Sequence, residues 1–296
     1  MSLFEGSGVA LITPFKNNKV DYEKLSELIE FHIENKTDSI IICGTTGESS
    51  TMSDYEKKEI IKFTVDKVNK RIPVIAGTGG NNTSYAIQLS KYAEEVGVDG
   101  LLLVTPYYNK ATQKGLIEHY NAIATEVNIP IILYNVPGRT GVNILPKTVY
   151  ELSKIKNIKA IKEASGNISQ VAEIARLCGD EFYIYSGNDD MIVPVLSLGG
   201  KGVISVVANI LPKETHDIVM KYLEGKVLEA RNAQLRMLDL INTLFIEVNP
   251  IPVKTAMNIL GMEVGNLRLP LTDMEDKNKK ILIQAMEEYG VRNWRK

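Results

Sequence analysis

A lysine and a tyrosine close two successive apolar segments of this sequence. The segment 158–162 ends in Lys162, and the preceding segment, 130–134, ends in Tyr134. Desolvation lowers the pKa of a lysine, and the free amine can attack a ketone to form an imine. A phenol beside the amine can transfer protons during that reaction. If the segments are neighbouring strands, about 4.8 Å apart, the two residues meet in one site, and the pattern predicts Schiff-base chemistry.

Both residues also have a structural interpretation. A lysine at a strand end often extends to solvent or pairs with a carboxylate, here that of Glu163. A tyrosine in a protein core often donates its hydroxyl group to a loop carbonyl. For Lys162 and Tyr134, the catalytic and the structural interpretations both stay open at the level of the sequence.

Other polar side chains follow the apolar segments. Thr45 and Thr46 lie between glycines, where backbone N–H groups and two hydroxyl groups could receive a carboxylate. The spacing of Thr45 and Glu48 also fits a helix capping box, which needs no ligand. Arg139 could bind a second carboxylate through two hydrogen bonds, or be a solvated loop residue. Tyr107 and Tyr108 could form an aromatic pair at a subunit interface, and the sequence favours this structural interpretation.

Eight short apolar segments alternate with helical patterns along the chain. They are 8–13, 39–43, 73–77, 100–104, 130–134, 158–162, 182–186 and 202–206. Continuous apolar runs are typical of parallel strands buried on both faces, and eight strand–helix units predict a (β/α)8 TIM barrel. The two-residue period of a strand would point Ile158, Ala160 and Lys162 into this barrel. A doubly wound open sheet is the alternative, but no Gly-x-Gly-x-x-Gly follows the first segment.

The strand pattern stops near residue 226. Beyond it, the segments 227–245, 251–260 and 272–289 have the pattern of helices. We therefore predict a catalytic barrel in residues 1–225 and a C-terminal three-helix domain in residues 226–296.

Composition and charge narrow the classes of partner. The chain has 296 residues, 44% of them hydrophobic, so a large core is expected. Its 34 basic and 36 acidic residues give a net charge of -2, which favours neither nucleic acid nor an anionic membrane surface. The early apolar stretch 9–15 contains Thr13 and Pro14, so we predict neither a signal peptide nor a membrane span and expect a cytoplasmic protein. The histidines and cysteines lack the spacing of metal ligands, so no metal site is predicted.

Several motifs in one order resemble the dihydrodipicolinate synthase family, within the pyruvate-dependent class I aldolases and lyases. The resemblance covers essentially the whole chain and rests on the motifs Gly44-Thr-Thr-Gly-Glu-Ser49, Thr105-Pro-Tyr-Tyr-Asn109, Tyr134-Asn-Val-Pro-Gly-Arg-Thr140, Ile161-Lys-Glu-Ala-Ser165, Ser186-Gly-Asn-Asp189 and Asn249-Pro-Ile-Pro-Val-Lys254. It implies that pyruvate and L-aspartate 4-semialdehyde condense to hydroxytetrahydrodipicolinate, towards diaminopimelate and lysine, with no external cofactor. It also suggests a homotetramer, assembled as a dimer of dimers.

The same resemblance implies a role for each of four catalytic residues. Lys162 forms the Schiff base with pyruvate, and Tyr134 relays protons. Thr45 connects Tyr134 to Tyr108, which would enter from a neighbouring subunit.

Four further residues are expected to bind the substrates. By the resemblance, Thr46 holds the pyruvate carboxylate, and Arg139 binds the carboxylate of aspartate semialdehyde. Backbone carbonyl groups near Gly187 and Ile204 would face the imine or the incoming substrate.

The sequence leaves alternative functions beside the synthase. An N-acetylneuraminate lyase or a 2-keto-3-deoxy sugar-acid aldolase would keep Lys162 and Tyr134 but accept a longer, polyhydroxylated partner. Arg139 and the consecutive Thr45 and Thr46 favour the synthase. The alternative of a different class is a non-catalytic barrel that binds a keto acid.

One departure from the family pattern concerns feedback by lysine. Lysine-inhibited members tend to carry histidines and a glutamate around an interface pocket, where this chain has Asp54, Lys57 and Tyr85. Because the cation of Lys57 would repel a second cation, weak or absent inhibition by lysine is expected.

Overall fold

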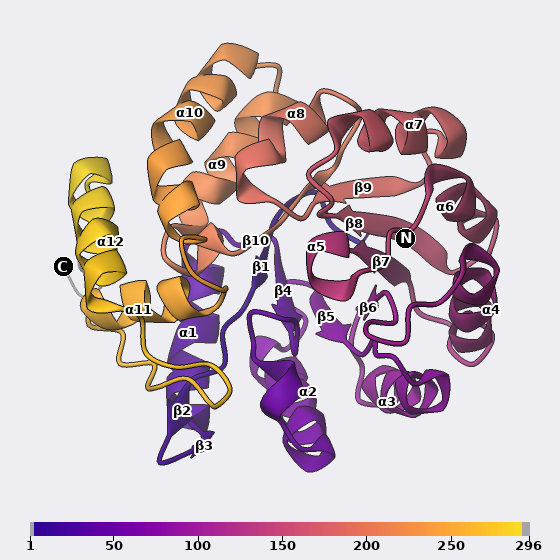
Figure 1. Cartoon of the computed structure of the whole chain (residues 1–296), viewed down its shortest axis with the longest axis horizontal. Helices are drawn as coiled ribbons and strands as arrows, with labels where there is room; N and C mark the ends of the chain where they lie inside the picture. Colours follow the sequence, from indigo (N-terminus) through magenta and orange to yellow (C-terminus); the bar gives the residue numbers. More distant parts are fainter. Residues whose placement is uncertain (1–2, 292–296) are drawn as a thin grey trace.

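Eight parallel strands close into a barrel at the centre of the molecule (Figure 1). The computed structural model describes residues 3–291. In chain order the barrel strands are β1 (Gly6–Ala10), β4 (Ser39–Ile42), β5 (Val74–Gly77), β6 (Gly100–Val104), β7 (Ile131–Asn135), β8 (Ile158–Glu163), β9 (Tyr183–Ser186) and β10 (Gly202–Ser205). Each strand pairs with the next barrel strand in the chain, and β10 closes the barrel onto β1. The predicted TIM barrel is confirmed.

Helices cover the outside of the barrel. In chain order they are α1 (Tyr22–Glu34), α2 (Asp54–Val68), α3 (Thr83–Glu95), α4 (Gln113–Ala124), α6 (Pro146–Ser153), α7 (Ile168–Cys178), α8 (Ile192–Leu196) and α9 (Pro212–Leu223), with the single turn α5 (Pro137–Thr140) before α6. Local side chains start these helices: Asp21 accepts a hydrogen bond from the backbone of Lys24, and Ser53 and Glu56 form a capping box at the start of α2. A small antiparallel hairpin, β2 (Phe15–Lys16) and β3 (Lys19–Val20), follows β1.

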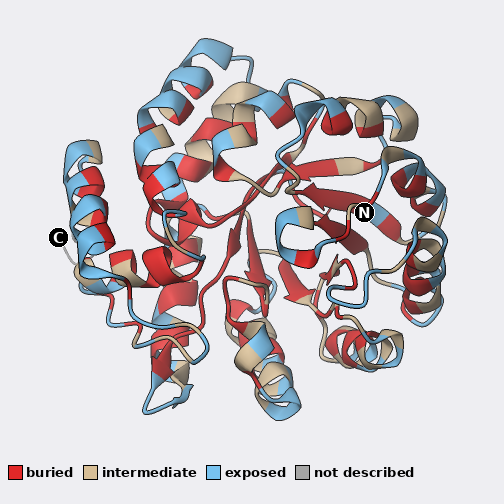
Figure 2. Ribbon diagram, viewed as in Figure 1, coloured by how far each residue is buried: buried red, intermediate tan, exposed pale blue. Residues whose placement is uncertain are grey.

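Buried apolar side chains form two layers. One layer lies between the strands and the helices, and the other fills the barrel. The inner layer consists of Leu3, Phe4, Ala10, Ile41, Ile75, Leu102, Ile132, Tyr134, Val136, Ala160, Tyr185 and Ile204. Figure 2 shows that the strands are buried, whereas the helices expose their outward faces. The strands are therefore covered on both faces, which explains their continuous apolar sequences.

A β-bulge in β8 changes one prediction about the inner face. The register of β7 and β8 shifts between Ile131 and Ile132, which pair with Ile158 and Ala160. As a result Ile158 packs in the outer layer, while Ala160 lies in the inner one. The prediction that Ile158 points into the barrel is wrong, because the extra residue of the bulge interrupts the two-residue period. Beyond the bulge the alternation resumes, and Lys162 faces inward as predicted.

Three helices follow the barrel, as predicted. They are α10 (Val227–Thr243), α11 (Ile251–Ile259) and α12 (Asp276–Tyr289), and they lie along the side of the barrel formed by α1 and α9 (Figure 1). The last helix begins at Asp276 rather than at Thr272. Glu247 accounts for this start, because its carboxylate accepts hydrogen bonds from the backbone of Glu275 and the side chain of Asn278.

Within residues 3–291, no helix combines the length and the apolar character needed to cross a membrane.

Candidate active site

Lys162 and Tyr134 lie side by side on the inner face of the barrel. They are directly paired across β7 and β8. The Nζ atom of Lys162 lies 4.4 Å from the centre of the Tyr134 ring. The two residues are only 5% and 7% exposed, so the amine is removed from bulk solvent. The structure therefore brings together the amine and the phenol that the sequence placed at successive strand ends.

The Lys162 amine lacks the partner that the structural interpretation requires. Among residues 3–291 it forms no ion pair, and Glu163 faces away from it, bound to Asn135 and Gln170. The hydroxyl group of Tyr134 likewise has no hydrogen-bond partner in that range. A buried amine without a carboxylate is suited to act as a nucleophile, and an unengaged phenol beside it is suited to transfer protons.

A polar network holds β7 and β8 together directly behind this pair. Oε2 of Glu163 accepts hydrogen bonds from Nδ2 of Asn135 at 2.9 Å and from Nε2 of Gln170 at 3.2 Å. Its Oε1 accepts one from the backbone N–H of Ser165 at 2.7 Å. Asn135 and Glu163 directly follow the tyrosine and the lysine in sequence and face the opposite side of the strands. The outer network therefore fixes the direction of the two inner side chains.

The loop after β4 brings two hydroxyl groups to the same end of the barrel. Thr45 lines the cavity that also contains Tyr134. Thr46 is buried, and its Oγ1 accepts a hydrogen bond from Nδ2 of Asn249 at 3.0 Å. A hydroxyl group has one proton to donate, and this contact leaves that proton available for a ligand carboxylate.

Glu48 does not cap a helix. It precedes the short turn η1 (Ser49–Thr51) and makes no capping hydrogen bond there. Its carboxylate instead forms a buried ion pair with Lys254, which comes from α11. The capping-box interpretation of Thr45 and Glu48 is therefore wrong, because a residue distant in sequence takes the carboxylate.

Arg139 lies in α5 beside the same opening. It lines a cavity of about 300 Å³ together with Thr45, Tyr134 and Tyr107. Its Nη2 donates a hydrogen bond to the backbone carbonyl of Asn249 at 3.2 Å. The other guanidinium N–H groups remain for a ligand. This position at the cavity favours the carboxylate-binding interpretation over that of a solvated loop arginine.

Tyr108 does not join the cavity of its own chain. Its side chain is 91% exposed, and its backbone has a φ of 71°, in the left-handed region. The adjacent Tyr107, in contrast, lines the cavity, and its carbonyl accepts a hydrogen bond from Nδ2 of Asn81 at 3.1 Å. The loop is thus tied to the barrel by Tyr107 and leaves Tyr108 projecting outward.

Gly187 and Ile204 belong to the two strands beyond Lys162. Gly187 follows β9, and its N–H donates to the carbonyl of Glu163 at 2.8 Å. A Cβ atom at Gly187 would lie 2.5 Å from the Cβ of Ala164, so a larger residue does not fit beside β8. Ile204 lies in β10, within the inner apolar layer.

Asp189 is a buried acid at this end of the barrel to which the sequence analysis assigned no role. Its Oδ2 accepts hydrogen bonds from the backbone N–H groups of Val206 and Val207, both at 3.0 Å. Its Oδ1 is buried and, within residues 3–291, has no hydrogen-bond partner. Burial raises the pKa of this carboxyl group, against the opposing effects of its hydrogen bonds and of the Lys162 charge. The sequence did carry a signal that could have identified Asp189, because it is an acidic residue shortly after a predicted buried strand.

The described residues contain no group of three or more His, Cys, Asp or Glu side chains placed to hold a metal ion. Two of the three histidines are buried in helices. Burial lowers the pKa of His32 to about 3 and that of His119 to about 4. Both therefore stay neutral near pH 7 and lie outside the site.

Comparison with known proteins gives matches over nearly the whole chain. Residues 3–289 match the model of the dihydrodipicolinate synthetase family. The chain is 63% identical over 290 residues to the 4-hydroxy-tetrahydrodipicolinate synthase of Clostridium novyi and 64% identical over 289 residues to that of Acetivibrio thermocellus, with 98% of each chain covered. A crystal structure of dihydrodipicolinate synthase from Aquifex aeolicus is 49% identical, with a TM-score of 0.96, and covers 98% of this chain and 100% of its own.

Proposed function

The chain belongs to the dihydrodipicolinate synthetase family, and from this premise we propose that Lys162 forms a Schiff base with pyruvate, which then condenses with L-aspartate 4-semialdehyde. The chain is a lyase with 4-hydroxy-tetrahydrodipicolinate synthase activity, in the biosynthesis of diaminopimelate and lysine. One observation carries the mechanism: the buried Lys162 amine lies over the Tyr134 ring and, among the described residues, belongs to no ion pair.

The first half of the reaction joins Lys162 to pyruvate. The free amine attacks the ketone carbon to form a carbinolamine, which loses water to give the imine. Tyr134 supplies the proton to the departing hydroxyl group and takes up the proton that the nitrogen releases. Thr45, which lines the same cavity, connects Tyr134 to Tyr108 of a neighbouring subunit and thereby to solvent protons.

The second half uses the imine as an electron sink. Loss of a proton from the methyl group gives an enamine, whose terminal carbon attacks the aldehyde carbon of the second substrate. The amino group of the product then attacks the imine carbon, closes the ring and releases the Lys162 amine. None of these steps needs an oxidant or a reductant, so the reaction requires no external cofactor.

Two loops bind the carboxylates of the substrates. Thr46 donates its hydroxyl proton to the pyruvate carboxylate, because its oxygen already accepts a hydrogen bond from Asn249. Arg139 binds the carboxylate of aspartate semialdehyde at the cavity mouth. The backbone carbonyl groups near Gly187 and Ile204 face the imine or the incoming aldehyde from the adjoining strands.

We also propose that the enzyme is a homotetramer, built as a dimer of dimers. The exposed Tyr108 supports this assembly, since its ring has no place in its own chain and is available to a second subunit. The division into a barrel of residues 1–225 and a helical domain of residues 226–296 stays a proposal, supported by the turn between α9 and α10. The cytoplasmic location also stays a prediction.

The mechanism is tested by reducing the enzyme with borohydride in the presence of pyruvate and comparing wild type, Lys162→Ala and Arg139→Ala. We expect a covalent mass increase at Lys162 in the wild type and in Arg139→Ala, and none at position 162 in Lys162→Ala. In turnover assays Lys162→Ala should abolish the reaction, whereas Arg139→Ala should mainly raise the KM for aspartate semialdehyde. An unmodified Lys162 in wild type, or equal activity of all three proteins, would contradict the site assignment.

The same assays separate the alternatives. A neuraminate lyase or sugar-acid aldolase would form the imine but turn over a polyhydroxylated aldehyde instead of aspartate semialdehyde. A non-catalytic barrel would bind the keto acid without forming the imine. Full-length identity of more than 60% to synthases favours neither alternative.

A further inference from the structure

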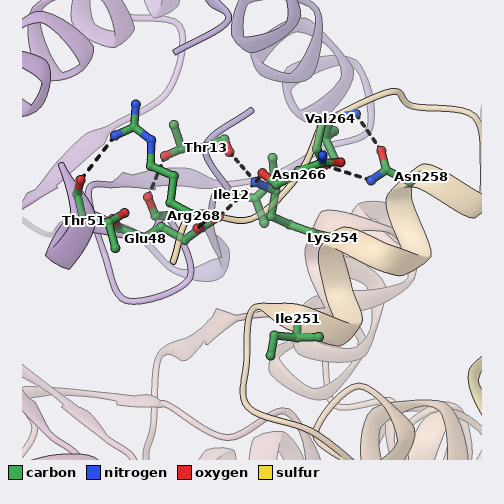
Figure 3. Close-up of polar contacts among 12 residues, drawn as sticks. Ile12, Thr13, Glu48, Thr51, Ile251, Lys254, Asn258, Val264, Asn266 and Arg268 are labelled. Atoms are coloured by element: carbon green, nitrogen blue, oxygen red, sulfur yellow. Dashed lines mark hydrogen bonds and ion pairs between the residues drawn. The ribbon is translucent and has the colours of Figure 1, made fainter. Parts of the chain in front are cut away.

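A fully buried ion pair joins the C-terminal helices to the loop that carries Thr46. Lys254 of α11 reaches across to Glu48, and their side chains are 2% and 0% exposed (Figure 3). The ammonium group donates three hydrogen bonds: to Oε1 of Glu48 at 2.9 Å, to the carbonyl of Thr13 at 3.1 Å and to the carbonyl of Asn266 at 2.8 Å. All three N–H protons of Lys254 are therefore used.

The carboxylate of Glu48 is held from a second side as well. Its Oε2 accepts a hydrogen bond from the backbone N–H of Arg268 at 3.0 Å. The Arg268 side chain continues outward to Glu56, and the two form a partly exposed ion pair at 2.6 Å. Lys254 and Arg268 both lie over the ring of Phe15, at 4.6 Å and 4.1 Å. The buried pair is thus satisfied in its hydrogen bonds and fixed in its geometry.

Stability alone does not explain why charged residues occupy this place. Removing two charges from water costs free energy, and apolar residues of similar volume often replace a buried ion pair without loss of stability. Burial lowers the pKa of Lys254, against the opposing effects of the charge and the hydrogen bond of Glu48. What a buried ion pair provides better than apolar residues is one defined geometry.

The geometry that is defined here is that of the turn 45–48. Glu48 has a φ of 55°, in the left-handed region that residues other than glycine rarely adopt. Its N–H donates to the carbonyl of Thr45 at 3.1 Å, and Oγ1 of Thr13 donates to the carbonyl of Gly47 at 2.7 Å. The turn is therefore held from the barrel side by Thr13 and from the opposite side by Lys254.

The residues just before α11 contact both carboxylate-binding residues. Asn249 lies five positions before Lys254 and donates to Thr46 at 3.0 Å. Its backbone carbonyl accepts the hydrogen bond from Arg139 at 3.2 Å. The segment 249–254 therefore contacts Thr46, Arg139 and, in the turn 45–48, Glu48.

We propose that the Glu48–Lys254 ion pair positions the turn 45–48 so that the Thr46 hydroxyl group and the turn's N–H groups meet the carboxylate of pyruvate. The inference rests on the proposed function. Both residues act through Thr46 and touch no reacting atom, so they are positioning residues. Loosening the pair should weaken pyruvate binding more than it weakens use of the aldehyde, which Arg139 holds.

The test replaces the pair with apolar residues of similar size, Glu48→Leu with Lys254→Met, in the full-length enzyme. We expect a folded protein whose KM for pyruvate rises by about 10- to 100-fold, because small displacements of a binding group have effects of this size. The KM for aspartate semialdehyde should change much less. Borohydride at saturating pyruvate should still modify Lys162.

The matched control is Arg268→Met, which removes the neighbouring ion pair with Glu56 but keeps the backbone hydrogen bond from residue 268 to Glu48. We expect its pyruvate KM to stay within about twofold of wild type, as is usual away from a binding group. An unchanged pyruvate KM in the folded double variant, or an equal rise in Arg268→Met, would overturn the proposal.

A second variant keeps the proposal testable if the double variant does not fold. Glu48→Gln keeps the size of the side chain and removes its charge, and we expect the same selective rise in the pyruvate KM. If the double variant does not fold, a Glu48→Gln enzyme with wild-type pyruvate dependence overturns the inference. Failure of wild type to trap pyruvate at Lys162 would instead overturn the proposed function, so the two outcomes are distinguishable.

Discussion

At the scale of the residue, the site depends on which charged groups are paired and which are not. Lys162 is buried and, among residues 3–291, belongs to no ion pair, whereas Lys254, buried to a similar extent, is bound to Glu48 and to two carbonyl groups. Three hydrogen bonds and a counter-ion keep an ammonium group charged and inert. The amine over the Tyr134 ring lacks them, and this difference in partners separates a nucleophile from a structural cation.

Lys57 gives a prediction about regulation at the same scale. Its ammonium group lines the cavity and donates to the hydroxyl group of Tyr85 at 3.2 Å, and that hydroxyl group donates to Asp54 at 2.6 Å. The only carboxylate of this trio is thus already engaged, and a free lysine would meet a like charge. We expect no inhibition of turnover by L-lysine at millimolar concentrations. Inhibition at millimolar lysine or below in a turnover assay would contradict this.

At the scale of the element, β7 and β8 act as one unit because their outer faces share a network. Tyr134 and Lys162 are paired in register, and so are Asn135 and Glu163 directly after them. A shift of either strand by one residue would break the outer hydrogen bonds and turn the inner pair away from the cavity. The catalytic geometry and the stability of this strand pair therefore depend on the same contacts.

Glu163→Ala tests this coupling. The substitution removes the acceptor of the Ser165 N–H, and it leaves the amides of Asn135 and Gln170 with Asn143 Oδ1 as their remaining acceptor. We expect the free energy of unfolding to fall by about 2 to 4 kcal/mol, and kcat to fall as well. Denaturant unfolding and steady-state turnover measure the two effects.

The control is Glu151→Ala on α6, which removes an exposed ion pair with Lys154. Its effect on the free energy of unfolding should stay below about 1 kcal/mol. Equal stability of the two variants would show that the network does not hold the strands.

At the scale of the whole molecule, the C-terminal helices complete the site as well as the fold. α10 packs against α8 and α9, and α12 packs against α10 and α11 (Figure 1). Asn249, just before α11, and Lys254 within it contact the loop that follows β4. The chain therefore closes its active site with residues from beyond the eighth strand.

The buried His32 makes the free energy of unfolding of the whole molecule depend on pH. Burial lowers the pKa of His32 to about 3, whereas in the unfolded chain it lies near 6.5. Between these values the unfolded state binds a proton that the folded state does not. The contribution of His32 to the free energy of unfolding is therefore complete above about pH 6.5 and is lost as the pH falls. The expected slope is about 1.4 kcal/mol per pH unit from this residue.

Comparison of wild type with His32→Gln isolates this contribution. Chemical unfolding measured from pH 7 to pH 4.5 should show a shallower loss of stability in the variant. Some slope should remain, because burial also lowers the pKa of His119 to about 4. Equal slopes for the two proteins would show that His32 does not titrate in this way.

The sequence by itself determined the barrel, the start of α2 and the central pair of residues, because each depends on short-range patterns. Strands buried on both faces need continuous apolar runs, and a capping box needs Ser53 and Glu56 three residues apart. Lys162 and Tyr134 could be predicted to meet because successive parallel strands are neighbours in a barrel. The roles of these and the other site residues remain predictions that the proposed experiments test.

Only the tertiary structure decided which partner each polar group takes. Thr45 and Glu48 have the spacing of a cap, yet the carboxylate binds Lys254, 206 positions away. The bulge in β8 turned Ile158 outward, although no residue in the segment 158–163 marks a bulge. Local patterns set what a segment can form, but a buried charge binds the group that docking of distant helices brings within hydrogen-bond distance. That choice depends on the packing of the whole chain.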